Sequence, residues 1–315
     1  MLIAPAAFVE DLMDHHRFHW LEKVQVQLAT LLSLALVYYV SWSYMEPRDP
    51  GGPVSFAATG SYGQMILFAL TVWALAAVGA VLTVSARPEG AMLAAFIGAG
   101  GVSLHSTSIR PLLWNWAGRL SGLYWVLIVE MILLGLLVSL TVVVVVLLRR
   151  LIERFKPAWA WTPPLGAGLP PAGAGQHRGR PQQLARCAYC LLLGVFGSAV
   201  LLLLLMQSGE RGQTLFAVLI SFVLSSLVAH QVFPSCNSAV AWATPVVTGI
   251  LFYALASASL SGVPPDAWAK TPFYAYALPV DWMTAGGGGA LLGFWTSQRI
   301  HEFRHFEKEA QRKGT

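Results

Sequence analysis

One acidic side chain lies deep inside a long apolar stretch, and it is the best candidate for a functional group. Glu130 follows the run LYWVLIV and precedes MILLGLLV. A carboxyl group in the apolar core of a membrane is costly unless it faces protein or water, and such residues commonly bind protons or ions. His105 and Ser108 lie at a similar predicted depth in the preceding stretch. We therefore predict a proton- or cation-binding site at Glu130, His105 and Ser108, with a purely structural interhelical hydrogen bond as the alternative.

The three cysteines and one histidine form a second candidate site. Cys187 and Cys190 are three residues apart, which places them on one face of a helix. His230 and Cys236 lie at the same predicted depth. Three thiolates and one imidazole are a known ligand set for structural zinc. We interpret the cysteines as packing residues, with a structural zinc site at these four residues as the alternative.

A third candidate is the sequence His-Glu-x-x-His near the C-terminus, formed by His301, Glu302 and His305. In zinc metallopeptidases two such histidines bind the metal and the glutamate acts as a general base. Here Arg304 places a charge inside the motif, and the residues around it are mostly charged, as on a solvated helix. We predict a solvated helix, and retain a catalytic or an adventitious zinc site as alternatives.

Membrane-spanning helices must position these residues. The chain has 315 residues, of which 56% are hydrophobic and 11% are charged, and its mean hydropathy is +0.61. Soluble domains carry about 25% charged residues. This composition excludes an ordinary soluble enzyme, a disordered chain and a disulfide-rich secreted domain. The predicted fold class is all-α, a polytopic integral membrane helix bundle.

Eight stretches are long and apolar enough to cross a bilayer as helices of about 20 residues. The third is a weaker candidate, and the eighth is short and rich in glycine. The stretches are 25–45, 64–85, 91–109, 122–148, 187–207, 213–233, 238–259 and 282–299.

The distribution of lysine and arginine predicts the orientation of these helices. With eight spans and both termini in the cytoplasm, 15 of the 20 basic residues lie on the cytoplasmic side. If the third stretch does not cross, the best arrangement has seven spans and only 13 basic residues inside. We therefore predict eight spans in the cell inner membrane. The expected partners are the lipid bilayer, anionic head groups at the cytoplasmic face, and other membrane subunits, but no nucleic acid.

The same reading divides the chain into five regions. The membrane halves contain four spans each, and a basic linker rich in proline and glycine separates them. This linker is interpreted as a tether, with a docking or regulatory role as the alternative. The regions are an interfacial segment (1–24), the first half (25–148), the linker (149–186), the second half (187–299) and a charged tail (300–315).

Glycine is concentrated in the eighth stretch. Gly289 and Gly293 form a GxxxG pair, a pattern that allows two helices to approach closely. Four consecutive glycines, residues 286–289, indicate either a hinge or tight packing. Asp281, just before this stretch, is expected to cap the helix.

The function predicted from these features is a transporter or channel-like protein, or a non-catalytic subunit of a membrane complex. A faint repeat relates spans 2–4 to spans 5–7 with opposite orientation, which is typical of transporters. The alternatives are a membrane scaffold and a membrane-bound zinc metalloenzyme.

Overall fold

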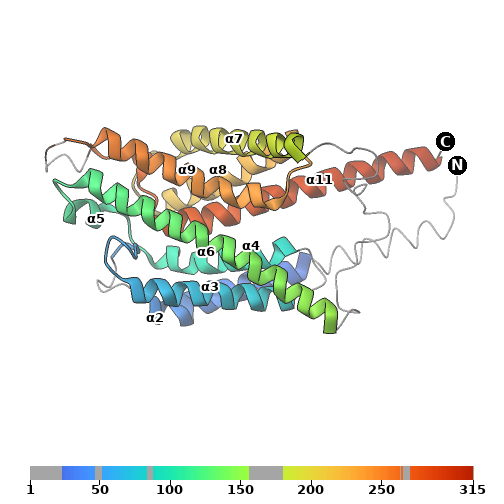
Figure 1. Ribbon diagram of the computed structural model, residues 1–315, viewed down its shortest axis with the longest axis horizontal. Helices are drawn as coiled ribbons and strands as arrows, with labels where there is room; N and C mark the ends of the chain where they lie inside the picture. The colour runs from blue at the N-terminus through green and yellow to red at the C-terminus, as the bar shows by residue number, and fades with distance from the viewer. Residues whose placement is uncertain are drawn as a thin grey trace.

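The computed structural model describes residues 23–46, 52–83, 88–155, 180–262, 264 and 270–314. These residues form a bundle of helices, and the described part of the chain contains no strand (Figure 1). The prediction of an all-α polytopic bundle is therefore confirmed. Six helices are long and apolar enough to cross a membrane, and they are Lys23–Met45, Tyr62–Leu82, Leu120–Ile152, Gln182–Leu205, Arg211–Val232 and Ser238–Ser259.

The helical elements of the described residues follow one another along the chain in a fixed order. They are η1 (Val37–Ser41), α2 (Trp42–Met45), α3 (Tyr62–Leu82), α4 (Pro88–His105), α5 (Arg110–Asn115), α6 (Leu120–Phe155), α7 (Arg180–Leu205), α8 (Arg211–Val232), α9 (Ser238–Ser259), η4 (Phe273–Ala275), α10 (Pro279–Asp281), η5 (Trp282–Gly286) and α11 (Gly287–Gly314).

The third and eighth predicted spans are helical but are not among the six. The third falls on α4, and the eighth on η5 and the start of α11. Residues 91–96 of α4 are all buried, as are residues 286–291 at the junction of η5 and α11. A helix enclosed by protein needs no lipid-facing apolar surface, so small residues replace the leucines of the outer spans. Length and composition thus support six of the eight predicted spans.

Two groups of three helices make up most of the bundle. Helices α3, α4 and α6 pack on one another, and so do α7, α8 and α9. The groups meet where α6 packs on α9, and where α11 contacts both α8 and α4. Figure 1 shows α5 at one end of the bundle and the tail of α11 projecting from the other. We call these the α5 end and the tail end.

The ends of the predicted linker differ from the structure. Helix α6 continues to Phe155 and α7 begins at Arg180, so both helices extend into the region 149–186. The α6 extension is fixed by Arg149, whose guanidinium donates to the carbonyl oxygen of Thr83 at 2.8 Å. Residues 156–179 and nearly all of the predicted segment 1–24 lie outside the described residues. The predicted tail continues α11 as helix.

The predicted GxxxG pair brings α11 against α8. A Cβ atom added at Gly289 would lie 2.5 Å from the carbonyl oxygen of Leu219, and one added at Gly293 would overlap the carbonyl oxygen of Val223. Backbone atoms cannot yield as a flexible side chain can. Close packing, rather than a hinge, therefore explains the glycines at these two positions.

We expect Gly293→Ala to destabilise the protein by about 1–3 kcal/mol, the usual cost of overpacking. The measurement is thermal unfolding in detergent. Gly63→Ala is the matched control, because an added Cβ at this position would meet nothing within 4 Å. Equal melting temperatures for the two variants would show that α8 and α11 are farther apart than described.

Candidate functional site

Glu130 lies in the first third of α6 and is fully buried, with 0% of its surface exposed. It follows the first residue of the helix by ten positions, which is about 15 Å at 1.5 Å per residue. Its carboxylate interacts with the irregular segment 52–61, which connects α2 to α3, rather than with another helix. The predicted buried acid is therefore present, but its partners lie in a loop.

Three hydrogen-bond donors hold the Glu130 carboxylate. Oε2 accepts from the Ser55 hydroxyl at 2.5 Å and from the Ala57 amide at 3.0 Å. Oε1 accepts from the Phe56 amide at 3.1 Å. We call these three donors the Glu130 cradle. Successive backbone N–H groups that converge in this way form an anion-binding concavity.

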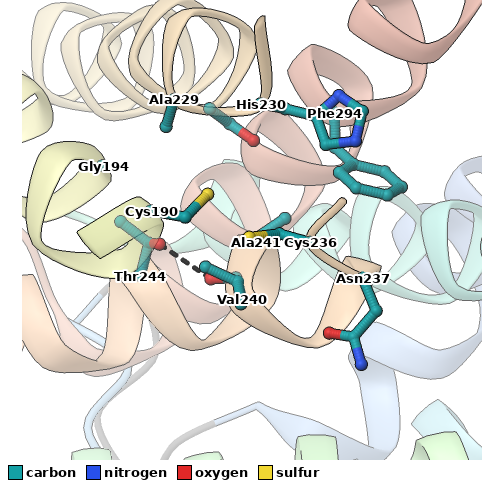
Figure 2. Close-up of a pocket in the computed structure, with 11 residues that line it drawn as sticks. Cys190, Gly194, Ala229, His230, Cys236, Asn237, Val240, Ala241, Thr244 and Phe294 are labelled. Atoms are coloured by element: carbon teal, nitrogen blue, oxygen red, sulfur yellow. Dashed lines mark hydrogen bonds between the residues drawn. The ribbon is translucent and has the colours of Figure 1, made fainter. Parts of the chain in front are cut away.

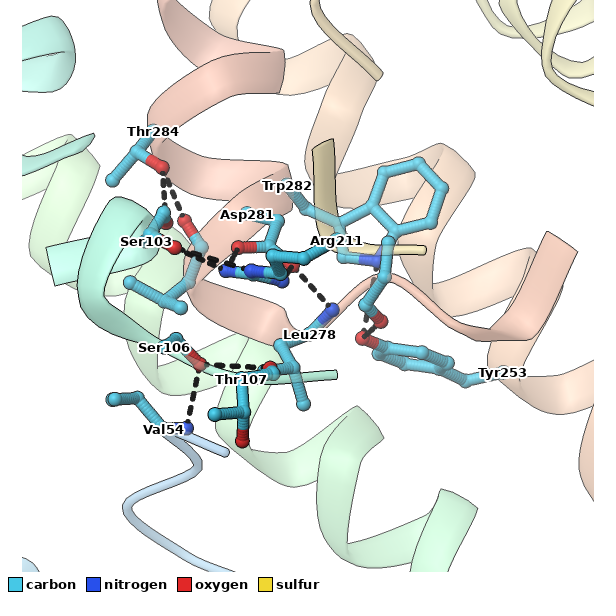
Figure 3. Close-up of polar contacts among 12 residues, drawn as sticks. Val54, Ser103, Ser106, Thr107, Arg211, Tyr253, Leu278, Asp281, Trp282 and Thr284 are labelled. Carbon is cyan, nitrogen blue, oxygen red and sulfur yellow. Dashed lines mark hydrogen bonds and ion pairs between the residues drawn. The ribbon is translucent and has the colours of Figure 1, made fainter. Parts of the chain in front are cut away.

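Segment 52–61 is packed into the α5 end of the bundle. Ser55 is 1% exposed and Phe56 is 2% exposed. The Phe56 ring lies 5.3 Å from the Phe68 ring of α3, and the Val54 amide donates to the Ser106 hydroxyl at 2.9 Å (Figure 3). Non-helical backbone at membrane depth is tolerated only where protein or water satisfies its polar groups. Glu130 and Ser106 do this for three amides of the segment.

A buried ion pair lies near this segment. Arg211, the first residue of α8, donates through Nη1 and Nη2 to the two carboxylate oxygens of Asp281 at 2.6 and 2.5 Å. The Arg211 side chain is 17% exposed and that of Asp281 is 0% exposed. Arg211 also donates to the carbonyl oxygen of Ser103 near the end of α4, at 2.7 and 3.1 Å (Figure 3). One guanidinium thus joins three elements of the bundle.

Asp281 has a different role from the predicted helix cap. It lies three residues after the cap position, which is occupied by Leu278, and accepts the Leu278 amide at 2.8 Å. Its main partner is Arg211 at the start of α8. Ser103 near the end of α4 accepts from Arg211. Ser106, three residues later, accepts the Val54 amide of the segment that Glu130 holds. The two carboxylates therefore belong to one buried polar region at the α5 end.

The other members of the first predicted site have different surroundings. The Nε2 atom of His105 is 2.9 Å from the carbonyl oxygen of Tyr38. Its ring stacks on Tyr38 and Trp42, with centroid distances of 4.1 and 4.6 Å. Ser108 is partly buried in the connection between α4 and α5. The hydrogen-bond partners of the Glu130 carboxylate are therefore the three donors of the Glu130 cradle, and not His105 or Ser108 as expected from the sequence.

The four candidate zinc ligands are only partly brought together. Cys187, Cys190 and Cys236 pack in one small cluster, where burial raises the pKa of the Cys236 thiol. The Nδ1 atom of His230 instead lies 2.9 Å from the Ser297 hydroxyl. Figure 2 shows Cys190 and Cys236 close together and the His230 ring beside Phe294. The described residues contain no group of three or more histidine, cysteine or acidic side chains that could hold a metal ion.

The histidine motif near the C-terminus lies on α11. His301 packs 5.8 Å from the His230 ring, and its Nε2 atom is buried without a hydrogen-bond partner. The side chains of Glu302 and His305 lie outside the described residues. The motif is thus on a helix, as predicted, and zinc binding there stays a prediction.

Comparisons with known proteins give no further assignment. No family model, curated protein or solved structure matches the chain. The fold and the buried polar region define a multi-pass membrane protein with an all-helical bundle, and any narrower function must be argued from the site.

Proposed function

We propose that this protein is a membrane transporter and that Glu130 is its proton-binding group. The observation that carries the proposal is a fully buried carboxylate within a spanning helix that holds a non-helical segment through three donors. Intramembrane acids of this kind are typical of proton relays in transporters. A proton on Glu130 would compete with the donors for the same oxygens, so protonation would weaken the attachment of segment 52–61.

The cradle favours a proton over a metal cation. Its three groups direct N–H and O–H hydrogens at the carboxylate, and a metal cation bound there would face their positive ends. A proton is small enough to occupy one carboxylate oxygen while the other still accepts a hydrogen bond. We therefore narrow the predicted proton or cation site to a proton site.

The arrangement of the helices also supports transport. The α3–α4–α6 and α7–α8–α9 groups share the same packing pattern, and a shift of three helices reverses their direction in the membrane. Transporters commonly contain such inverted repeats and discontinuous helices. The π-helical η5 joins α10 to α11 without a non-helical break, and π-helical turns occur frequently at functional sites.

The test is proton flux in liposomes that contain the purified protein. A proton gradient directed into the liposomes is imposed in salt solution, with the membrane potential held at zero by potassium and valinomycin, and internal pH is followed with a trapped dye. Faster acidification than in protein-free liposomes would support the proposal. A rate equal to that of protein-free liposomes over a range of pH and added solutes would favour the scaffold or subunit alternative.

We further propose that both termini are cytoplasmic, that the membrane is the cell inner membrane, and that anionic head groups bind near the tail end. This rests on the predicted basic asymmetry and on the exposed Arg150 and Arg154 at the end of α6. A reporter fused after Thr315 is expected to read cytoplasmic, and one inserted at the exposed Ser261–Gly262 turn is expected to read external. The opposite pair of signals would invert the topology and place the Glu130 cradle on the cytoplasmic side.

A further inference from the structure

The Glu130 cradle has the composition of an anion site. Its donors come from three consecutive residues, Ser55, Phe56 and Ala57, and they contact both oxygens of one carboxylate. These donors, rather than a lysine or arginine, are the groups that bind Glu130. A set of donors that can hold a buried carboxylate of the protein has the right chemistry to hold a free anion of similar size.

We propose that Glu130 occupies an anion-binding site as an internal substitute for the substrate, and that the transported species is a small monovalent anion accompanied by a proton. This inference rests on the proposed function and names its substrate class. When Glu130 takes up a proton, its neutral carboxyl competes poorly for the donors. The cradle is then free to bind the anion, so one proton and one anion enter the site together without net charge.

The size and surroundings of the cradle restrict the ligand. The donors span only the two oxygens of a carboxylate, which matches a halide, nitrate or a one- to two-carbon carboxylate. Val54 and Phe56, which are 1% and 2% exposed, make the surroundings apolar, so a bulky or multiply charged anion would lose its hydration without sufficient compensation. Ala57, Ala58 and Thr59 are only partly buried, so the cradle lies one residue layer below the surface of the α5 end.

The binding test uses Glu130→Ala, which removes the internal carboxylate and leaves the donors in place. We expect sodium formate to raise the melting temperature of this variant in detergent, saturably and by at least about 2 °C, because a ligand that binds only the folded state stabilises it. At alkaline pH, where Glu130 is ionised, the same salt should leave wild type unchanged, since its cradle is filled. Sodium gluconate, whose anion is too large, should have no effect on either protein.

Leu134→Ala is the matched control. Leu134 is 1% exposed and lies one helical turn after Glu130 on α6, so its truncation leaves a buried cavity without the three donors. Formate should not stabilise this variant. Equal responses of Glu130→Ala and Leu134→Ala to formate, or no response of Glu130→Ala, would overturn the anion site.

A flux measurement on wild type provides a second test that does not depend on the variant folding. A chloride or nitrate gradient directed into the liposomes should drive internal acidification, because neither anion crosses as a neutral acid. Proton flux that ignores both anions would overturn this inference and leave the proposed transporter intact. The absence of any proton flux, combined with formate rescue of Glu130→Ala, would overturn transport and retain the anion site.

Discussion

Replacing Glu130 with glutamine is expected to abolish proton-coupled flux while leaving a folded, membrane-inserted protein. Glutamine has nearly the same shape as glutamate but cannot bind a proton in the physiological range. It retains one acceptor oxygen for the cradle, whereas the Glu130 carboxylate uses two. The measurement is the pH dependence of flux in liposomes at equal protein content. Flux in the variant should be lost or become independent of pH.

The stability of Glu130 variants separates a functional role from a structural one. Glu130→Gln leaves one donor poorly satisfied, at about 1–3 kcal/mol, and Glu130→Leu leaves all three unsatisfied, at about 3 kcal/mol or more, by the usual cost of a buried unpaired donor. Thr141→Val on the same helix is the control, since its hydroxyl is buried but bonds only to the carbonyl oxygen of Leu137. A Gln variant with normal pH-dependent flux would assign Glu130 a structural role alone.

The fold was largely predictable because lipid imposes a simple rule on composition. Helices that face lipid must be long and apolar, and those stretches were found in the sequence. The exceptions are α4 and the η5–α11 junction, which are enclosed by protein and rich in alanine and glycine. Burial by other helices depends on tertiary packing, and hydropathy along the chain does not report it.

The candidate site was only half predictable. The cost of a buried carboxyl group identified Glu130, but its partners Ser55, Phe56 and Ala57 precede it by more than seventy residues. Two of the three partners are backbone amides, which every residue except proline carries, so the residue types do not indicate the contact. One signal was present in the sequence: segment 52–61 has no charged residue, which is unusual for a connection that is fully exposed to water.

The ion pair between Arg211 and Asp281 could not be predicted from the sequence for a similar reason. Each lies at the end of a helix. A basic residue in that place indicates the membrane topology, and an acidic residue indicates a helix cap. Their pairing depends on how α8 and α10 meet, seventy residues apart in the chain. Their burial distinguishes this pair from Arg110 and Glu210, whose atoms lie 3.9 Å apart and whose side chains are 50% and 76% exposed.

Asp281→Asn is expected to destabilise the protein by about 3–5 kcal/mol, because removing one partner leaves the other charge buried and unpaired. Arg211 would retain the carbonyl oxygen of Ser103 but lose the charge that balances it. Glu210→Gln is the control on the exposed pair, and it should change stability by no more than about 0.5 kcal/mol. Thermal or denaturant unfolding in detergent measures both.

The double variant Arg211→Met/Asp281→Leu decides whether the ion pair itself or its desolvation dominates. If the cost of Asp281→Asn comes from a stranded guanidinium, removal of both charges should recover most of the lost stability, as apolar replacements of buried pairs often do. The recovery appears as a favourable interaction energy in the double-mutant cycle that the single variants Arg211→Met and Asp281→Leu complete. Additive losses would instead mean that each side chain acts separately, Arg211 through Ser103 and Asp281 through the Leu278 amide. In that case the packing of α4, α8 and α10 on one another would depend on backbone hydrogen bonds. This packing would persist when the charges are neutralised.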